Sequence, residues 1–180
     1  PESPEIVIMN SHDGSSSHRL SLGMYRLACA NGMVVKSADL SEVRVRHSGE
    51  HDLIGDVIEG SYELIEEAPK LVAQINDWKD TTVSVEQQLA FAGSALELRD
   101  STLEVAPSQL LRARRSADRA DQHGNRSVWG AMNVVQENLI RGGVYGRNAK
   151  NEVRRLRGVK SVDTDNKLNR SLWSLTEKFN

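Results

Sequence analysis

Three short segments within the first 50 residues carry the hydrophobic pattern of β-strands. The first is an apolar run bounded by proline and asparagine, which is typical of a strand buried on both faces. The second is also apolar, and in the third valines alternate with arginines, as in a strand with one buried face. These segments are residues 4–9, 33–35 and 43–47.

Between the first two strands the spacing of apolar residues changes to that of a helix. Leu20, Met24 and Leu27 recur at intervals of four and three residues, which places them on one helical face. Asn31 and Gly32 follow and are typical of a helix C-terminus. The pattern therefore predicts a β-α-β-β order at the beginning of the chain.

Beyond residue 51 the pattern is mostly helical. Helical spacing continues over residues 52–78, and Pro69 should kink or split this segment because proline cannot donate the helical hydrogen bond. Three further helices are predicted over residues 84–96, 128–139 and 168–179.

We therefore expect the α+β class, with a strand-rich part at residues 1–51 and a helical part at residues 52–180. A strand that is apolar on both faces needs hydrogen-bonded neighbours on both edges. Because only three strand candidates are present, we expect the missing strands to come from a preceding segment or from another chain.

Composition excludes several classes of protein. The 180 residues are 38% hydrophobic and include one cysteine, Cys29, which rules out an internal disulfide framework and a multi-cysteine zinc site. No apolar run approaches the roughly 18 residues that a membrane-spanning helix needs, and the first residues lack the pattern of a secretory signal. These features favour a cytoplasmic protein without a membrane segment.

Charge is distributed unevenly along the chain. Residues 1–100 carry 8 Lys and Arg against 17 Asp and Glu, a net charge of −9, whereas residues 101–180 carry 15 against 8, a net charge of +7. Such a division favours contacts between the two halves, within one chain or between subunits, or binding of the basic half to a polyanion.

The basic half contains a glycine-hinged loop at residues 141–160, with four glycines and seven basic side chains. Arginine binds phosphates bidentately, glycine lets a backbone approach, and an aromatic ring stacks on a base. We expect this loop to bind nucleic acid, with single-stranded DNA favoured. The candidate residues are Arg141, Tyr145, Arg147, Lys150, Arg154, Arg155 and Arg157.

The alternative is that this loop and a second basic stretch at 112–126 pair with acidic residues of the first half, namely Glu59, Glu63, Glu66 and Glu67.

A polar turn at residues 10–17 is the most distinctive stretch of the first half. If a helix begins after it, the free N–H groups of the first turn favour an anion; equally, the Asn, Asp and Ser side chains cap the helix and fix the turn. The candidate anion-binding residues are Ser15, Ser16 and Arg19. A motif without an assigned role precedes them: Asn10, Ser11, His12, Asp13 and Gly14.

A third hypothesis is an enzyme that uses Asn10, His12 and Asp13 of this turn, with phosphodiesters as the candidate substrates. Ser11, His12 and Asp13 are adjacent, so their side chains diverge and cannot align as a catalytic triad. A metal site that combines them with His47 and His51 is opposed by the Ser-Gly turn between these two histidines. We expect no enzymatic activity, no metal centre and no cofactor.

Six motifs spread over nearly the whole chain carry a resemblance to a known family. They include NSHDGSS at residues 10–16 and QENLIRGG at residues 136–143. The others lie at residues 23–35, 45–49, 57–62 and 168–173. In these motifs the chain resembles the phage/plasmid-like protein family called domain of unknown function 932 (DUF932).

The resemblance implies the biology of bacterial phages, prophages and plasmids, without an established activity. Members generally carry an extra N-terminal segment with strand-like stretches. With that segment the order of elements is similar to the strand-rich core of Rad52-type single-strand annealing proteins, which is an analogy of fold alone.

These observations together predict a non-enzymatic nucleic-acid-binding protein of a mobile element, in the cytoplasm of a bacterial host. We expect it to hold or anneal single DNA strands and to form homo-oligomers. The alternative is a structural or regulatory interaction module whose acidic and basic halves bind each other or a host protein.

Overall fold

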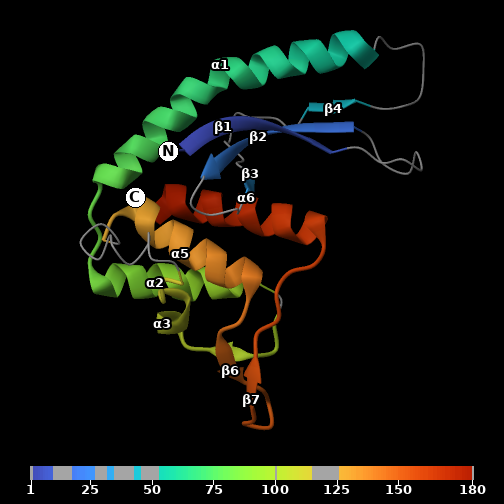
Figure 1. Cartoon of the computed structure of the whole chain (residues 1–180). Helices are drawn as coiled ribbons and strands as arrows, with labels where there is room; N and C mark the ends of the chain where they lie inside the picture. Colours follow the sequence, from blue (N-terminus) through green and yellow to red (C-terminus); the bar gives the residue numbers. More distant parts are fainter. Residues whose placement is uncertain are drawn as a thin grey trace. The chain divides into compact units, whose positions relative to one another are not determined.

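The computed structural model of the chain describes residues 2–9, 18–26, 32–34, 43–45, 53–99, 101–114 and 126–179. The chain divides into two compact units, Pro1–Gln74 and Ile75–Asn180. Over the described residues it is mostly helical and carries two small antiparallel sheets (Figure 1). This mixed content confirms the α+β class.

The first sheet is built around strand β2. Strand β1 pairs antiparallel along the whole length of β2, from Glu2 opposite Arg26 to Met9 opposite Arg19. Strands β3 and β4 pair with the opposite ends of β2 along its other edge. The bounds are Glu2–Met9 for β1, His18–Arg26 for β2, Gly32–Val34 for β3 and Val43–Val45 for β4. All three predicted strands are present.

The helix predicted from Leu20, Met24 and Leu27 is wrong. His18–Arg26 forms β2, and Leu27 lies outside the described residues. Apolar residues at 20, 22 and 24 also recur with the period of a strand, and pairing with β1 selects that conformation over the helical one. Among the described residues of this part the order is therefore β-β-β-β in place of β-α-β-β.

This correction removes the helix on which the anion cradle depended. Arg19 lies in β2, opposite Met9 of β1 and Arg44 of β4. The whole polar turn, including Ser15, Ser16 and the motif at residues 10–14, lies outside the described residues.

Helix α1, Leu53–Asp80, continues through Pro69 as one curved helix (Figure 1). Pro69 therefore does not split it. The carbonyl that proline leaves without its helical donor belongs to Ile65, and Ile65 is 56% exposed. Water can satisfy that carbonyl, so the helix tolerates the proline.

The core of the second unit forms around three tryptophans. Trp78 of α1 lies with its ring centroid 4.5 Å from that of Trp173 and 6.4 Å from that of Trp129. All three side chains are buried. The helices that supply this core besides α1 are α2 (Val85–Glu97), α3 (Pro107–Leu110), α5 (Val128–Arg141) and α6 (Val162–Phe179).

Serine side chains begin two of these helices. Ser84 and Gln87 form a reciprocal capping box at α2, with N–O distances of 3.2 and 2.8 Å. Ser127 Oγ accepts from the backbone N–H of Gly130 at 3.0 Å and begins α5. Local side-chain hydrogen bonds thus fix where the helices of this unit start.

The predicted loop at 141–160 contains a β-hairpin, so its description as a loop is wrong. Strand β6, Tyr145–Arg147, pairs antiparallel with β7, Val153–Arg155. On its other edge β6 pairs with β5, Glu104–Val105, which completes a three-stranded sheet. The strands are too short and too charged for a hydrophobic period to reveal them.

Candidate functional site

The basic segment 141–160 starts at two glycines that end α5. Gly142 has φ 62° and Gly143 has φ 87°, conformations that glycine adopts at little cost. A Cβ atom at position 142 would lie only 2.5 Å from the carbonyl oxygen of Leu156. The glycines therefore turn the chain and allow the returning strand to pass close to the end of α5.

Backbone hydrogen bonds hold the base of the hairpin against that helix end. The N–H of Gly143 donates to the carbonyl of Leu156 at 2.7 Å, and the N–H of Leu156 donates to Val144 at 2.8 Å. Farther along, the N–H of Val159 donates to the carbonyl of Ile140 at 2.7 Å. The hairpin is thus mounted on the helical core.

Arg99, which follows α2, stabilises the same region although it lies outside the segment 141–160. Its guanidinium donates to the carbonyl oxygens of Leu139 and Arg157, and so joins the end of α5 to the strand that leaves the hairpin. Burial lowers the pKa of Arg99. The sequence did not lead us to predict a role for Arg99. Its only distinguishing feature in the sequence is that it is an isolated arginine between residues 80 and 111.

Asn138 of α5 is a second anchor, and its side chain is almost fully buried. Its Nδ2 donates to the carbonyls of Leu110 at 2.8 Å, Arg112 at 3.0 Å and Val134 at 3.2 Å. Its Oδ1 accepts from Nε of Arg114 at 2.5 Å. One amide therefore holds the 110–114 segment on the helix that carries the hairpin.

We expect Asn138→Ala to lower the free energy of unfolding by about 2 kcal/mol, because it leaves buried carbonyls without a donor. Asn133→Ala is the matched control. Asn133 is equally buried on α5, but its Nδ2 donates only within the helix, to Trp129 at 2.7 Å, and we expect a loss below about 1 kcal/mol. Urea unfolding followed by circular dichroism measures both values. Equal losses would contradict the anchoring role of Asn138.

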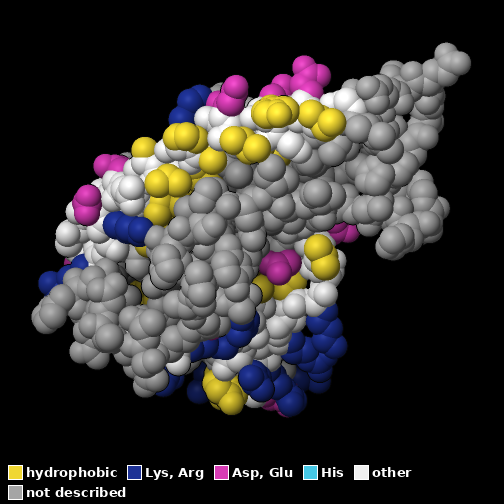
Figure 2. Space-filling view, turned by 45° about the horizontal axis from the view of Figure 1, so that its top comes forward, with side chains coloured by type: hydrophobic (Ala, Val, Ile, Leu, Met, Phe, Trp, Pro, Cys, Tyr) yellow, Lys and Arg dark blue, Asp and Glu magenta, His cyan; other side chains and the backbone are white. Residues whose placement is uncertain are grey.

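Six basic side chains line one hollow beside the hairpin, with a volume of about 1010 Å³. Residues 101–103 form part of its wall, and within the described part of the chain no Asp or Glu lines it. Lys and Arg side chains gather into a dark blue patch in Figure 2. The six basic residues are Arg99, Arg141, Arg154, Arg155, Arg157 and Lys160.

These six cations differ in how far neighbouring groups neutralise them. Arg141 Nε lies 3.8 Å from Oε1 of Glu137, and Arg154 Nη2 lies 2.7 Å from Oε2 of Glu152. Three side chains have no hydrogen bond or ion pair with any described residue: Arg155, Arg157 and Lys160. Among the described residues, nothing neutralises these three charges, and all three side chains are exposed.

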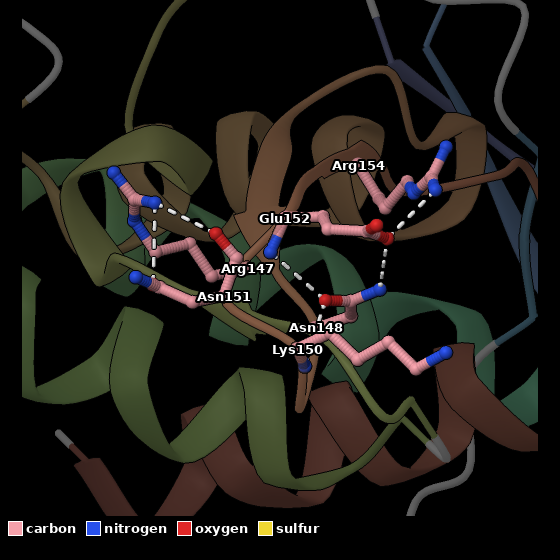
Figure 3. A network of polar contacts seen from close by, with 6 residues as sticks. All are labelled: Arg147, Asn148, Lys150, Asn151, Glu152 and Arg154. Atoms are coloured by element: carbon pink, nitrogen blue, oxygen red, sulfur yellow. Dashed lines mark hydrogen bonds and ion pairs between the residues drawn. The ribbon is translucent and has the colours of Figure 1, made fainter.

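The turn of the hairpin is organised by Asn148 (Figure 3). Its Oδ1 accepts from the backbone N–H groups of Lys150 at 3.0 Å and Glu152 at 2.9 Å. Its Nδ2 donates to Oε2 of Glu152 at 3.0 Å. The ion pair with Arg154, and secondly the bond from Asn148, hold the pKa of Glu152 below its usual value. Glu152 is thus ionised at neutral pH and keeps Arg154 engaged.

Arg147 stabilises the other side of this turn. Its Nη1 donates to the carbonyl oxygen of Asn151 at 2.9 Å and to its Oδ1 at 3.2 Å. Asn151 has φ 61°, a left-handed conformation that asparagine tolerates better than most residues. Arg147 therefore has a structural partner, in contrast to Arg155 and Arg157.

The structure brings four of the predicted residues together in the hollow: Arg141, Arg154, Arg155 and Arg157. Three others, Tyr145, Arg147 and Lys150, lie on the hairpin outside its lining. Tyr145 is 55% exposed.

No group of three or more His, Cys, Asp or Glu side chains that could hold a metal occurs in the described part of the chain. His12, Asp13, His47 and His51 all lie outside that part, as does Cys29. Likewise, none of the helices that the structure describes has the length and apolar character needed to cross a bilayer.

Comparison with known proteins identifies a family and curated relatives, among them two Escherichia coli proteins. Residues 1–173 match the family described as Domain of unknown function (DUF932). The UPF0380 protein YfjQ of Escherichia coli (strain K12) is 38% identical over 180 residues, covering 97% of this chain and 62% of the relative. The UPF0380 protein YafZ of the same organism is 38% identical over 176 residues, with the same coverage. The chain thus spans about three fifths of these relatives. No solved structure matches it.

Proposed function

This chain belongs to the DUF932 family, and for it we propose nucleic-acid binding without catalysis, with single-stranded DNA as the favoured ligand. The resemblance to phage and plasmid proteins supports a role in a mobile element of a bacterial host. The observation that carries the proposal is the hollow lined by six basic side chains and, among the described residues, by no acidic one.

Phosphate contacts dominate the affinity of proteins for nucleic acid, and the hollow supplies the groups for them. Arg155 and Arg157 have planar guanidinium groups that bind phosphate oxygens in pairs. Lys160 adds a third cation without a partner among the described residues. Arg99 and the glycine turn fix the backbone around these side chains, so little ordering is required when a ligand binds.

Tyr145 supports a single-stranded ligand. Its ring is 55% exposed on β6, and an exposed ring next to basic residues stacks on an unpaired base. Only 4% of the residues are aromatic, which is too few to form an extended surface on which successive bases stack. The binding we propose is therefore dominated by phosphate contacts, with one stacking position.

Fluorescence anisotropy with labelled single-stranded and double-stranded DNA tests this function. If six cations engage phosphates of a single strand, log affinity should fall against log salt with a slope of roughly −4. We expect tighter binding of the single strand. Absence of binding to either DNA at 50 mM salt would overturn the proposal, and equal affinity for both would overturn the preference.

Glu152→Gln should raise the affinity for single-stranded DNA by roughly 2- to 5-fold, because it releases Arg154 from an exposed ion pair. Glu66→Gln is the matched control, since it removes the same charge from α1, outside the hollow. We expect no change of affinity for this control. Anisotropy at low salt measures both, and an equal rise in the two variants would show an effect of net charge alone.

The second candidate function is a structural or regulatory interaction module. The observation that favours it is that large apolar side chains are exposed on α1 and on the hairpin. These side chains contribute nothing to phosphate binding.

A further inference from the structure

Helix α1 has an apolar face that no described residue covers. Ile58, Tyr62 and Ile65 follow one another at intervals of four and three residues, and are 52%, 65% and 56% exposed. The side chains that α1 buries, such as Leu64 and Leu71, occupy a different face of the helix. Figure 2 shows the exposed hydrophobic side chains as a yellow row over α1.

A row of carboxylates accompanies this apolar face. Glu59, Glu63 and Glu66 each follow one residue after a member of the apolar row, so they repeat with the same spacing along one side of it. All three are exposed. The magenta side chains beside the yellow row in Figure 2 belong to the same helix. We call Ile58, Tyr62, Ile65 and these three glutamates the acidic face.

The hairpin carries the opposite combination. Tyr145 pairs with Arg155 and Arg147 pairs with Val153 across β6 and β7, and residues opposite each other or two apart share one face of a sheet. All four side chains are exposed, with Tyr145 at 55% and Val153 at 59%. We call these four residues the basic face.

We propose that the acidic face of one copy of this chain binds the basic face of a second copy. Each face combines exposed apolar side chains with charges of one sign, and the signs are opposite. The proposal does not rest on nucleic-acid binding. Pairing of two acidic faces would set glutamates against glutamates, and pairing of two basic faces would set arginines against arginines, so contact between unlike faces is favoured over contact between like faces.

The dimensions of the two faces are comparable. Ile58 and Ile65 are two helical turns apart, about 10 Å, and each three-residue strand of the hairpin extends about 7 Å from its first to its last Cα atom. Such a contact is small, so we expect weak association, with a Kd on the order of 10–100 μM. Because the charged side chains of both faces are exposed, added salt should weaken it. A head-to-tail contact leaves one free face at each end, so it can continue into longer assemblies.

Sedimentation velocity of the nucleic-acid-free 180-residue chain at low salt is the first test. We expect the mean mass to rise with protein concentration, and less so at 500 mM salt.

Tyr62→Lys combined with Ile65→Lys should remove the acidic face, and Tyr145→Glu combined with Val153→Glu should remove the basic face. Each double variant alone should stay monomeric. Val85→Lys combined with Val162→Lys is the control, because it replaces exposed apolar residues outside both faces.

A mixture of the two double variants separates contact between unlike faces from pairing of like faces. Each variant keeps the face that the other lacks, so the mixture should form a 1:1 heterodimer that does not grow further. A wild-type chain that is monomeric up to 1 mM would overturn the proposal. So would a mixture without heterodimer, or a control that dissociates as fully as the face variants.

The acidic-face variant also separates this proposal from the nucleic-acid site. It leaves the residues that line the hollow unchanged, so its affinity for single-stranded DNA should equal that of the wild type. Loss of self-association with unchanged DNA affinity supports the proposal. Circular dichroism establishes that the variant is folded. Loss of DNA affinity in the folded variant would overturn the separation of the acidic face from the nucleic-acid site.

Discussion

Arg155→Glu combined with Arg157→Glu is expected to lower the affinity for single-stranded DNA by about 100-fold. Each substitution removes one charge-assisted contact with phosphate, which contributes about 1.5 kcal/mol or more. Both side chains line the hollow without a partner among the described residues, so no internal ion pair is lost. The slope of log affinity against log salt should become less steep by about 1.4.

Lys70→Glu combined with Lys178→Glu is the control for this double reversal. Both lysines are exposed and lie outside the lining of the hollow, and the change in net charge is identical. We expect a loss of less than about 3-fold, from long-range electrostatics alone. If the control lost as much affinity as the hollow variant, the binding would follow net charge and the hollow would not be the site.

Gly142→Ala is expected to lower the free energy of unfolding by at least about 3 kcal/mol. Its φ of 62° combines with ψ of −148°, a region almost confined to glycine. The new methyl group would also lie 2.5 Å from backbone atoms of Leu156 and Arg157, and backbone held by hydrogen bonds cannot withdraw easily. Urea unfolding provides the measurement.

Gly93→Ala serves as the control for the same chemical change. Gly93 lies within α2, where a Cβ would meet only the Cγ of Pro107 at an ordinary 3.7 Å. Alanine in a helix interior is favoured over glycine by up to about 1 kcal/mol, so this variant should be as stable as the wild type or more stable. If Gly142→Ala were no more destabilising than Gly93→Ala, the close approach of the hairpin to α5 would be refuted.

Helices α2 and α5 could be predicted because their signals are local, whereas α3 was not predicted and α6 begins at Val162, before the predicted residue 168. Val128, Met132, Val135 and Leu139 have helical spacing, and all four are buried on α5. A glycine follows at residue 142, where the helix ends. Spacing, capping residue and terminating glycine all lie within sixteen residues, so no distant contact is needed to interpret them.

Strand β2 could not be assigned in this way, because its sequence suits two periods. Leu20 and Met24 fit a helical face, whereas Leu20, Leu22 and Met24 fit one face of a strand. The decision is made by pairing with β1, in which Ile6 lies opposite Leu22 and Ile8 opposite Leu20. Such pairing is a property of two segments, and the periodicity of one segment does not contain it.

For the candidate site, the sequence indicated the arginines that line the hollow, but it did not indicate the residues that hold them in place. Arg141, Arg154, Arg155 and Arg157 attract attention because they cluster along the chain. Arg99 lies some 40 residues or more from this cluster and is recognisable only through its contacts with backbone carbonyls. Carbonyl groups occur at every residue, so no sequence pattern marks the two that it binds.

The tryptophan cluster has a consequence for spectroscopy. All three tryptophans of the chain lie in the second unit, buried around Trp78. Intrinsic fluorescence excited at long wavelength therefore reports on that unit and does not register the first sheet. A thermal melt followed by tryptophan emission can then be compared with one followed by the circular dichroism of the whole chain. Coincident midpoints would mean that the two units melt as one cooperative block, whereas separate midpoints would assign the optical transition to the second unit alone.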